Sequence, residues 1–542
     1  MGTLVNLGRF SRRRMLASSA LGLGGLLAAD TRHGFPRVAA ARQTDTAGTP
    51  KRGGTITAAL QNDWVSVDPL TSGGTLNPHH MIFEPLFNLQ PGENGIWQPV
   101  PALVEEWEVS ETTATLQLRQ GVTYHDGSAW DAESLQWNVV RWMTDPESQA
   151  GSSLASILDT DNPVAVVDSH TATLNLTRPS AVLIEQLAGT RTRPVSRAAY
   201  EAMSPAEWTL NAVGAGPFQI DDNRPGDRLI LKRFDNYWQQ GEDGEALPYL
   251  DGITFRLIID DSVRVLELQS GNIQLTELVP PKDIDTIKAD PTLTYIQSTW
   301  SGNQAMVTFN ETGGAFAGNV KLRQAALYAI NREVIADILG EGIGIPGSYV
   351  LVPGSLGYDE SLPHYTYDPE RAMSLMAEAG FPDGLDVSFP IISRELDKSQ
   401  AEILKQMWEQ IGIRATIDVL ERAAWVERVL GSSDFDVATF RTGGVATDPD
   451  VRYRGMFHSE GGSNYPKLEN EELDDLIDRA ASTYDPDERI ELYEQIQSLD
   501  FELAHYNSLW IYPWNWVHST TLKGFRPPLR IEWEVQDAWL EV

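Results

Sequence analysis

AEILKQMWEQIGIRATIDVL, residues 401–420, contains the clearest structural pattern in this chain of 542 residues. Apolar side chains recur there at the spacing of one helical face, at Ile403, Leu404, Met407, Trp408 and Ile411. Gly412 then ends the helix, and Ala415–Leu420 is rich in the residues that are typical of a strand. A helix, a glycine and a strand in direct succession indicate an α/β unit.

The same signals alternate along the rest of the chain. Short alternating or β-branched runs predict strands at Thr55–Leu60, Thr113–Leu118, Thr171–Leu176, Leu229–Lys232 and Ile253–Ile258. Amphipathic patterns predict a helix over Asp131–Met143 and two helices over Lys321–Leu339, the second capped by Asn331 and ended by Gly340. Asp368-Pro369 and Asp485-Pro486 predict two further helix starts. The interleaving predicts an α/β fold throughout.

Composition limits the classes of function. The length predicts about two or three domains. Cysteine is absent, which excludes disulfides, thiol catalysis and cysteine metal sites. The formal net charge is −34 at pH 7, and so acidic a surface repels nucleic acid and anionic lipid. We expect no nucleic-acid partner, while the charge itself is explained either by a cationic or neutral ligand or by solubility alone.

The first 41 residues have the features of an export signal. Ser11-Arg12-Arg13-Arg14-Met15-Leu16 contains a twin-arginine pair, and Ala17–Ala29 is an apolar run too short for a bilayer span of about 20 residues. Val38–Ala41 offers a cleavage site, and residues 42–51 follow as a flexible segment. The alternative is a disordered basic terminus. We expect a periplasmic or secreted protein that is soluble and carries no lipid-anchored cysteine.

Motifs of catalysis are scarce. The sequence has no His-Glu-x-x-His, no Gly-x-Ser-x-Gly and no phosphate-binding loop, which argues against an enzyme. Gly342–Gly347 fits Gly-x-Gly-x-x-Gly, but it follows a predicted helix rather than a strand. We therefore expect no dinucleotide there, and no cofactor elsewhere.

Two polar patterns are more simply structural than functional. His79-His80 lacks evident further metal ligands, so a structural pair in a loop is the simpler interpretation. Asp434-Phe435-Asp436 and Asp448-Pro449-Asp450 place carboxylates two residues apart, which is typical of turns and helix caps as well as of acid–base pairs. We expect no metal site from these residues.

Aromatic residues are concentrated near the C-terminus. An alternating strand over Trp510–Trp516 puts four rings on one face, those of Trp510, Tyr512, Trp514 and Trp516. Such a face is either a core surface or the wall of a ligand site, and the pattern alone does not decide between them.

These segments, in this order, resemble the family 5 extracellular solute-binding proteins, which serve as peptide and nickel receptors of ABC importers. The resemblance covers essentially residues 52–530. It rests on a dozen landmarks, which include Arg52–Thr57, Ile82–Phe87, Pro99–Val109, Leu116–Val122, His125–Ser128, Gly214–Phe218, Phe234–Trp238, Val320–Ala326, Ala329–Glu333 and Tyr367–Gly380.

The resemblance implies two α/β lobes that close on a ligand about a hinge. Residues 52–300 and 508–542 would form lobe I, with a subdomain within about 90–210, and residues 301–507 would form lobe II. The expected function is capture of a small polar solute, a short peptide or peptide-like compound, for the permease subunits of an ABC importer. We expect a monomer without enzymatic activity. An exported hydrolase, or a nickel or haem carrier using His79, His80 and His458, is the alternative.

The resemblance also implies where the solute binds. Peptide-binding members hold the ligand's ammonium with an acidic residue in the loop that matches Thr442–Asp450, where this chain has Gly443-Gly444-Val445. Asp448 is the remaining candidate, and Arg441 could bind a carboxylate or phosphate with two parallel hydrogen bonds. Ser301-Gly302-Asn303-Gln304 is expected to be a polar turn at the hinge. The predicted ligand-binding residues are Trp300, Asn303, Arg441, Asp448, Trp514 and Trp516.

Overall fold

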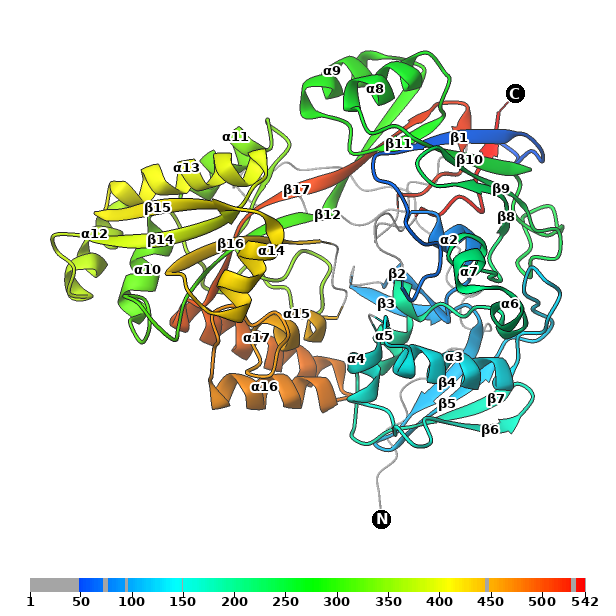
Figure 1. Cartoon of the computed structure of the whole chain (residues 1–542), viewed down its shortest axis with the longest axis horizontal. Helices are drawn as coiled ribbons and strands as arrows, with labels where there is room; N and C mark the ends of the chain where they lie inside the picture. Colours follow the sequence, from blue (N-terminus) through cyan, green and yellow to red (C-terminus); the bar gives the residue numbers. More distant parts are fainter. Residues whose placement is uncertain are drawn as a thin grey trace, which may run out of the picture.

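The computed structural model describes residues 48–71, 77–92, 96–148, 150–443, 448–527 and 533–541, and it consists of two α/β lobes (Figure 1). One large mixed sheet extends through both lobes, in the strand order β16-β12-β17-β11-β1-β10-β9-β8, and β13 adds to β17. The predicted two-lobed α/β fold is confirmed. The predicted export signal, residues 1–41, lies outside the described residues.

Lobe I contains most of this sheet. β1 (Thr55–Leu60) pairs in parallel with β10 (Gly252–Leu257) and with β11 (Leu275–Glu277). β9 (Arg228–Arg233) and β8 (Phe218–Arg224) extend the sheet in antiparallel fashion. The remaining elements of this part are α2 (His79–Ile82), α6 (Arg197–Ala202), α7 (Pro205–Asn211), α8 (Asp261–Gln269), α9 (Pro281–Ala289), β18 (Leu522–Lys523) and β19 (Trp539–Leu540).

A subdomain is inserted between β1 and β8. Its four-stranded sheet has the order β4-β5-β7-β6, and the hairpin β2–β3 lies beside it. Asp131 caps α3 by accepting a hydrogen bond from the backbone N–H of Ser134, as the sequence predicts. The elements are β2 (Phe87–Pro91), β3 (Trp97–Pro101), β4 (Val104–Val109), β5 (Thr113–Leu118), α3 (Ala132–Thr144), α4 (Gly151–Ala155), β6 (Val164–Asp168), β7 (Thr171–Asn175), α5 (Leu183–Leu187) and the 3-10 turn Thr190–Thr192.

Lobe II has the α/β unit that residues 401–420 predict. β14 (Leu385–Ile392) and β15 (Ile413–Leu420) pair in parallel, and α13 (Glu395–Glu409) connects them. Gly412 has a φ of +87°, a conformation that favours glycine, and it allows the strand to start directly after the helix. The other elements are α10 (Val320–Tyr328), α11 (Arg332–Leu339), β13 (Ile345–Pro346), α12 (Pro369–Glu378), α14 (Arg422–Val426), the π turn Glu427–Gly431, β16 (Val437–Thr442), α15 (Asp450–Met456), α16 (Glu471–Ser482) and α17 (Pro486–Leu503).

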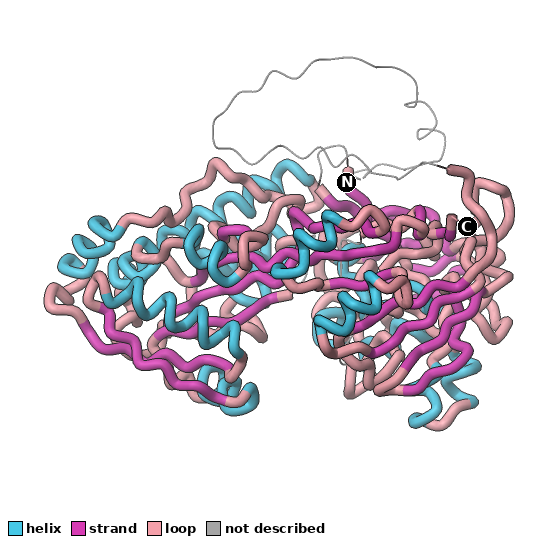
Figure 2. Tube along the Cα trace, turned by 90° about the horizontal axis from the view of Figure 1, so that it is seen from above, coloured by secondary structure: helices cyan, strands magenta, loops and turns pink. Residues whose placement is uncertain are grey.

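Two long strands connect the lobes. β12 (Leu293–Phe309) and β17 (Tyr506–Ser519) pair with each other in antiparallel fashion, and Figure 2 shows strands that continue from one lobe into the other. Their register shifts between Gln297, which faces Asn515, and Gly302, which faces Pro513. The crossing is therefore an irregular stretch of a continuous ladder, where bending is easiest.

The prediction of a polar turn at residues 301–304 is wrong, because this stretch is part of β12. Pairing with the full length of β17 keeps the backbone extended in spite of the polar sequence. Gly302 is required there by close packing: a Cβ atom at this position would lie 2.3 Å from the carbonyl oxygen of Tyr512.

Side chains of the crossing strands divide between the cores of the two lobes. Leu509 and Trp510 pack with the helices of lobe II, whereas Trp514 and Trp516 pack with β1 and β10 of lobe I. Along β17, packing thus changes from the core of lobe II to the core of lobe I between Trp510 and Trp514. This position is slightly beyond the predicted lobe boundary at residue 508. No helix in the described part of the chain has the length and apolar character that crossing a bilayer requires.

Candidate functional site between the lobes

The lobes contact each other beside the crossing strands through apolar side chains. Val352 and Ile511 are buried together, and Leu89, Trp97 and Ile345 pack against them. The backbone N–H of Trp97 also donates to the carbonyl oxygen of Gly354, over 3.4 Å. The hairpin β2–β3 of the subdomain therefore rests on lobe II next to the crossing.

A second contact lies at the C-terminal end of α16, where lobe II meets the subdomain (Figure 1). The Tyr484 hydroxyl donates to the carbonyl oxygen of Ser110 (2.9 Å) and accepts from the backbone N–H of Ser180 (3.1 Å). The N–H of Ala181 donates to the carbonyl oxygen of Ala481 (2.7 Å), and the Ala481 side chain is buried in the subdomain core. We call these contacts the Tyr484 latch; they hold the lobes together away from the hinge.

The end of β16 carries the first pair of predicted site residues. Arg441 Nη2 donates to Asp397 Oδ1 over 2.7 Å, and the Arg441 side chain is 22% exposed. Burial lowers the pKa of Arg441, although Asp397 opposes the effect. Asn303 is half-buried on β12, and its Oδ1 lies 3.5 Å from the place that a Cβ atom of Gly443 would occupy. The structure therefore brings Arg441 and Asn303 close together on adjacent strands at the crossing.

Asp448 has a different environment. Its carboxylate accepts hydrogen bonds from Arg489 Nη2 over 2.9 and 3.1 Å and from the Tyr493 hydroxyl over 3.3 Å. Both charged side chains are less than a tenth exposed. Burial alone would lower the pKa of Arg489, but Asp448 outweighs it and raises that pKa above its usual value. These contacts join the segment just before α15 to α17, so the carboxylate has a structural partner. A ligand contact of Asp448 stays a prediction.

The aromatic residues of β17 lie mostly in the two cores. Trp516 is 1% exposed and Trp514 is 6% exposed, both in the lobe I core. Trp510 is buried in lobe II and donates from Nε1 to Gln400 Oε1 over 2.8 Å. The side chain of Trp300, on β12, lies outside the described residues. The four rings of Trp510–Trp516 thus serve two cores, and their role as a ligand wall stays a prediction.

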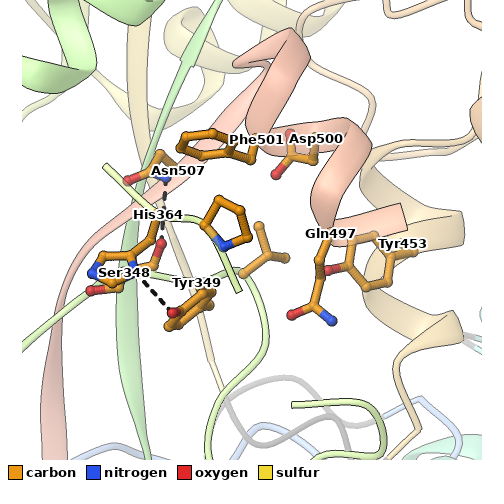
Figure 3. Close-up of a pocket in the computed structure, with 10 residues that line it drawn as sticks. Ser348, Tyr349, His364, Tyr453, Gln497, Asp500, Phe501 and Asn507 are labelled. Atoms are coloured by element: carbon orange, nitrogen blue, oxygen red, sulfur yellow. Dashed lines mark hydrogen bonds between the residues drawn. The ribbon is translucent and has the colours of Figure 1, made fainter. Parts of the chain in front are cut away.

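A small cavity lies inside lobe II and is separate from the predicted site residues (Figure 3). Ser348, Tyr349 and Val350 line one side of it, and Tyr453, Gln497 and Asp500 from α15 and α17 line another. None of the five predicted ligand-binding residues whose side chains the structure describes, Asn303, Arg441, Asp448, Trp514 and Trp516, lines this cavity. It belongs to the interior of one lobe rather than to the region between the lobes.

The three histidines that a nickel or haem carrier is expected to use do not lie together, because His79 and His80 are in lobe I and His458 is in lobe II. His79 and His80 form the first turn of α2, buried in lobe I, rather than the expected loop. The Nδ1 of His80 lies 3.1 Å from Arg193 Nη2, whereas His458 belongs to lobe II, near Asp474 and Asp478. In the described part of the chain, no group of three or more His, Asp or Glu side chains is arranged to hold a metal ion.

Sequence reasoning missed three residues of this region. Asp397 is in the first turn of α13, Arg452 is in the first turn of α15, and Tyr484 precedes α17. Each has an ordinary local sequence context, and its importance comes from contacts with distant segments. The only local signal is the Asp-Pro pair after Tyr484, which predicts the start of α17 but no contact between the lobes.

The comparisons with known proteins match this architecture. The family model for bacterial extracellular solute-binding proteins, family 5, matches residues 98–464, more than half of the chain. The chain belongs to this family.

Family 5 relatives cover most of the chain. The dipeptide-binding protein of Escherichia coli (strain K12) is 30% identical over 79% of this chain and 83% of its own length. The glutathione-binding protein GsiB of Salmonella paratyphi A is 29% identical over 87% of this chain and 91% of its own length. The structure of HbpA2 from Haemophilus parasuis superposes with a TM-score of 0.79 at 21% identity, covering 90% of this chain and all of that chain.

Membership settles the general role of the protein. Family 5 consists of extracellular binding proteins, and the protein is the solute-binding component of an ABC importer. The family and the structural neighbours are binding proteins rather than enzymes. The architecture agrees with this role, because two lobes joined by two strands can enclose a solute without covalent chemistry.

Proposed function

We propose that the protein captures a short peptide or peptide-like compound between its lobes and delivers it to the permease subunits of an importer. The single observation that carries the proposal is the crossing: β12 and β17 connect the lobes through a register shift, and the Tyr484 latch holds the lobes together away from it. This is the geometry of a hinge with a closing contact at the opposite end. The two curated relatives described above, a dipeptide- and a glutathione-binding protein, support peptide chemistry for the solute.

The proposed division of the chain follows the prediction. Residues 52–300 and 508–542 form lobe I and residues 301–507 form lobe II, with the subdomain within about 90–210, except that Leu509 and Trp510 of β17 pack with lobe II. Asn303 and Arg441 are the proposed polar contacts, because they lie together at the crossing. Trp300, Asp448, Trp514 and Trp516 complete the proposed set, with Asp448 acting in addition to its contact with Arg489.

The proposal is tested by finding the solute and measuring closure. Native mass spectrometry of protein purified from its own host is expected to show a bound compound of small mass. Adding that compound to the stripped protein should stabilise it by about 2.7 kcal/mol at a hundredfold excess over the dissociation constant. Small-angle scattering should show a smaller radius of gyration on saturation. An unchanged radius with saturating solute would contradict the hinge mechanism.

Export and assembly complete the proposal. The protein is a soluble, non-enzymatic monomer that reaches the periplasm or the medium through the twin-arginine route, without a lipid anchor. Changing Arg12 and Arg13 to Lys is expected to retain unprocessed precursor in the cytoplasm, because the guanidinium pair is what the route recognises. Mature protein outside the inner membrane in this variant would exclude that route.

A further inference from the structure

The small cavity inside lobe II is lined by polar groups that have no hydrogen-bond partner in the described part of the chain (Figure 3). The cavity has a volume of about 20 Å³. A water molecule needs a cavity of about 10–15 Å³, and it needs about two to four polar partners there. The volume therefore admits a single water molecule and excludes a larger ligand.

The first of these groups is the hydroxyl of Tyr453 on α15. Tyr453 is completely buried, and its hydroxyl has no hydrogen-bond partner within the described residues. Tyr506 in the same core cluster is equally buried, but its hydroxyl donates to the carbonyl oxygen of Ser463 over 3.0 Å. A buried hydroxyl without a partner loses the hydrogen bonds that it makes with water in the unfolded chain. The Tyr453 hydroxyl therefore needs an acceptor.

The second group is the side-chain amide of Gln497 on α17. Its Nε2 donates to the carbonyl oxygens of Gly357 (2.8 Å) and Tyr493 (3.1 Å), whereas its buried Oε1 accepts no hydrogen bond from the described residues. The two carbonyl oxygens fix the orientation of the amide, because the opposite orientation would place Oε1 against them. Gln497 thus has a free acceptor and Tyr453 a free donor.

Both groups and a carboxyl group line the same space. Gln497 and Asp500 are three residues apart on α17, so they lie on one face of the helix. The rings of Tyr453 and Tyr493 are stacked with their centroids 6.0 Å apart, which places Tyr453 against this part of α17. All three side chains line the cavity, so one O–H donor and two oxygen acceptors surround it.

We propose that the cavity binds one water molecule, which accepts a hydrogen bond from the Tyr453 hydroxyl and donates to Gln497 Oε1 and to the Asp500 carboxyl group. One donor and two acceptors match the hydrogen-bonding capacity of water. A metal ion would use only oxygen lone pairs and would leave the Tyr453 O–H without an acceptor.

The water would join α15 to α17 next to the contact of Asp448 with Arg489. Water-mediated bonds are nearly as favourable as direct ones. Since α15 begins two residues after Asp448, the water helps to fix the segment that carries this predicted ligand-binding residue. The inference goes beyond the proposed function and holds for any solute, because the cavity lies inside one lobe.

A high-resolution crystal structure of the wild-type protein tests the site directly. One ordered water is expected about 3 Å from both Tyr453 Oη and Gln497 Oε1. A cavity without ordered density would overturn the inference. Crystals grown with a thallium(I) salt test the alternative of a monovalent cation, and anomalous density in the cavity would overturn the inference as well.

The stability of Tyr453→Phe shows whether the hydroxyl is bonded. With the water in place, the variant loses a hydrogen bond, and its melting temperature is expected to fall by about 2–4 °C. The matched control is Tyr506→Phe, which removes an equally buried hydroxyl with a direct protein acceptor and should also melt lower. A melting temperature of Tyr453→Phe equal to or above that of the wild type would overturn the inference, because removing an unbonded hydroxyl costs nothing.

Crystal structures of the two variants identify the donor. The water in Tyr453→Phe is expected to be absent or more mobile, with a higher B-factor, because it has lost one of its three partners. The water in Tyr506→Phe should be unchanged. A water that is equally well ordered in both variants would show that Tyr453 does not hold it and would overturn the proposed site.

Discussion

Helix α15 lies between two charged regions of opposite character. On one side, Asp448 is held by Arg489 and Tyr493, and Asp450 is held by Arg454. On the other side, the Arg452 guanidinium has one hydrogen bond within the described residues, to the Thr442 hydroxyl, and no carboxylate partner there. The first region has its charges matched within the protein, and the second region has an excess of positive charge.

This difference distinguishes buried charges that stabilise the fold from buried charges that are available to bind a solute. Matched pairs fix helices to each other, and breaking one leaves an uncompensated charge that destabilises the fold. An unmatched charge is tolerated when something outside the chain completes it, so its removal should weaken binding rather than folding. Asp448 and Arg441 differ in this respect, whereas the buried carboxylates and the Tyr484 latch are expected to have smaller effects.

The largest effect is expected at Asp448. Asp448→Ala leaves Arg489 buried with the Tyr493 hydroxyl and the carbonyl oxygen of Ala480 as its remaining partners. The free energy of unfolding, measured with urea, is expected to fall by about 3–5 kcal/mol. In the double variant Asp448→Leu/Arg489→Met both charges are gone, and most of the loss should be recovered. A single variant as stable as the wild type would mean that the pair contributes nothing.

Arg441, which pairs with Asp397 and stays partly exposed, tests a charge that is proposed to bind solute. Arg441→Met is expected to weaken solute binding by about 2 kcal/mol, as expected for loss of a charged anchor, while Asp397→Asn should keep or strengthen binding because it frees the guanidinium. Calorimetry with the co-purified solute measures both. Equal losses of affinity in the two variants would show that Arg441 acts only through its pair with Asp397.

The sequence predicted the scaffold better than the site, and the reason is physical. Gly412, Asn331 and Asp485 act within a few residues of themselves, so the helix ends they determine can be predicted locally. Asp448 gives no local sign of Arg489, which lies 41 residues further along the chain. The expected turn at Ser301–Gln304 fails for the same reason, because pairing with β17 outweighs the local preference of polar residues.

The next effect is on the pH dependence of folding stability, and it comes from buried carboxylates. Asp500, which lines the cavity of Figure 3, has its pKa raised to about 8 by burial, and burial raises the pKa of Glu84 and of Glu277 to about 7. Groups whose pKa is higher in the folded state favour folding at low pH, and this contribution is lost as the pH rises from about 4 to about 8.

Asp500→Asn isolates one of these groups. The variant cannot ionise, so its melting temperature is expected to exceed that of the wild type by a few degrees at pH 8, with the difference shrinking toward pH 4. Melting curves across this range measure the effect. A constant difference at every pH would show that the substitution acts through packing or through the hydrogen bond from the Tyr506 N–H instead.

The smallest effect is expected at the Tyr484 latch, whose hydroxyl joins the lobes through uncharged partners. Tyr484→Phe removes the bonds to Ser110 and Ser180 but keeps the ring. Each of the two bonds is expected to contribute about 0.5 kcal/mol, the lower end of the usual range, because water replaces it when the lobes open. The open form should therefore gain population and solute should dissociate faster, with affinity lowered about fivefold. Tyr365→Phe is the matched control, because the Tyr365 hydroxyl bonds to the carbonyl oxygen of Phe501 within lobe II. The control should lose stability without a change in the radius of gyration of the free protein, whereas Tyr484→Phe should increase that radius. If both variants scatter alike and bind solute alike, the latch does not control closure, and the crossing strands alone determine it.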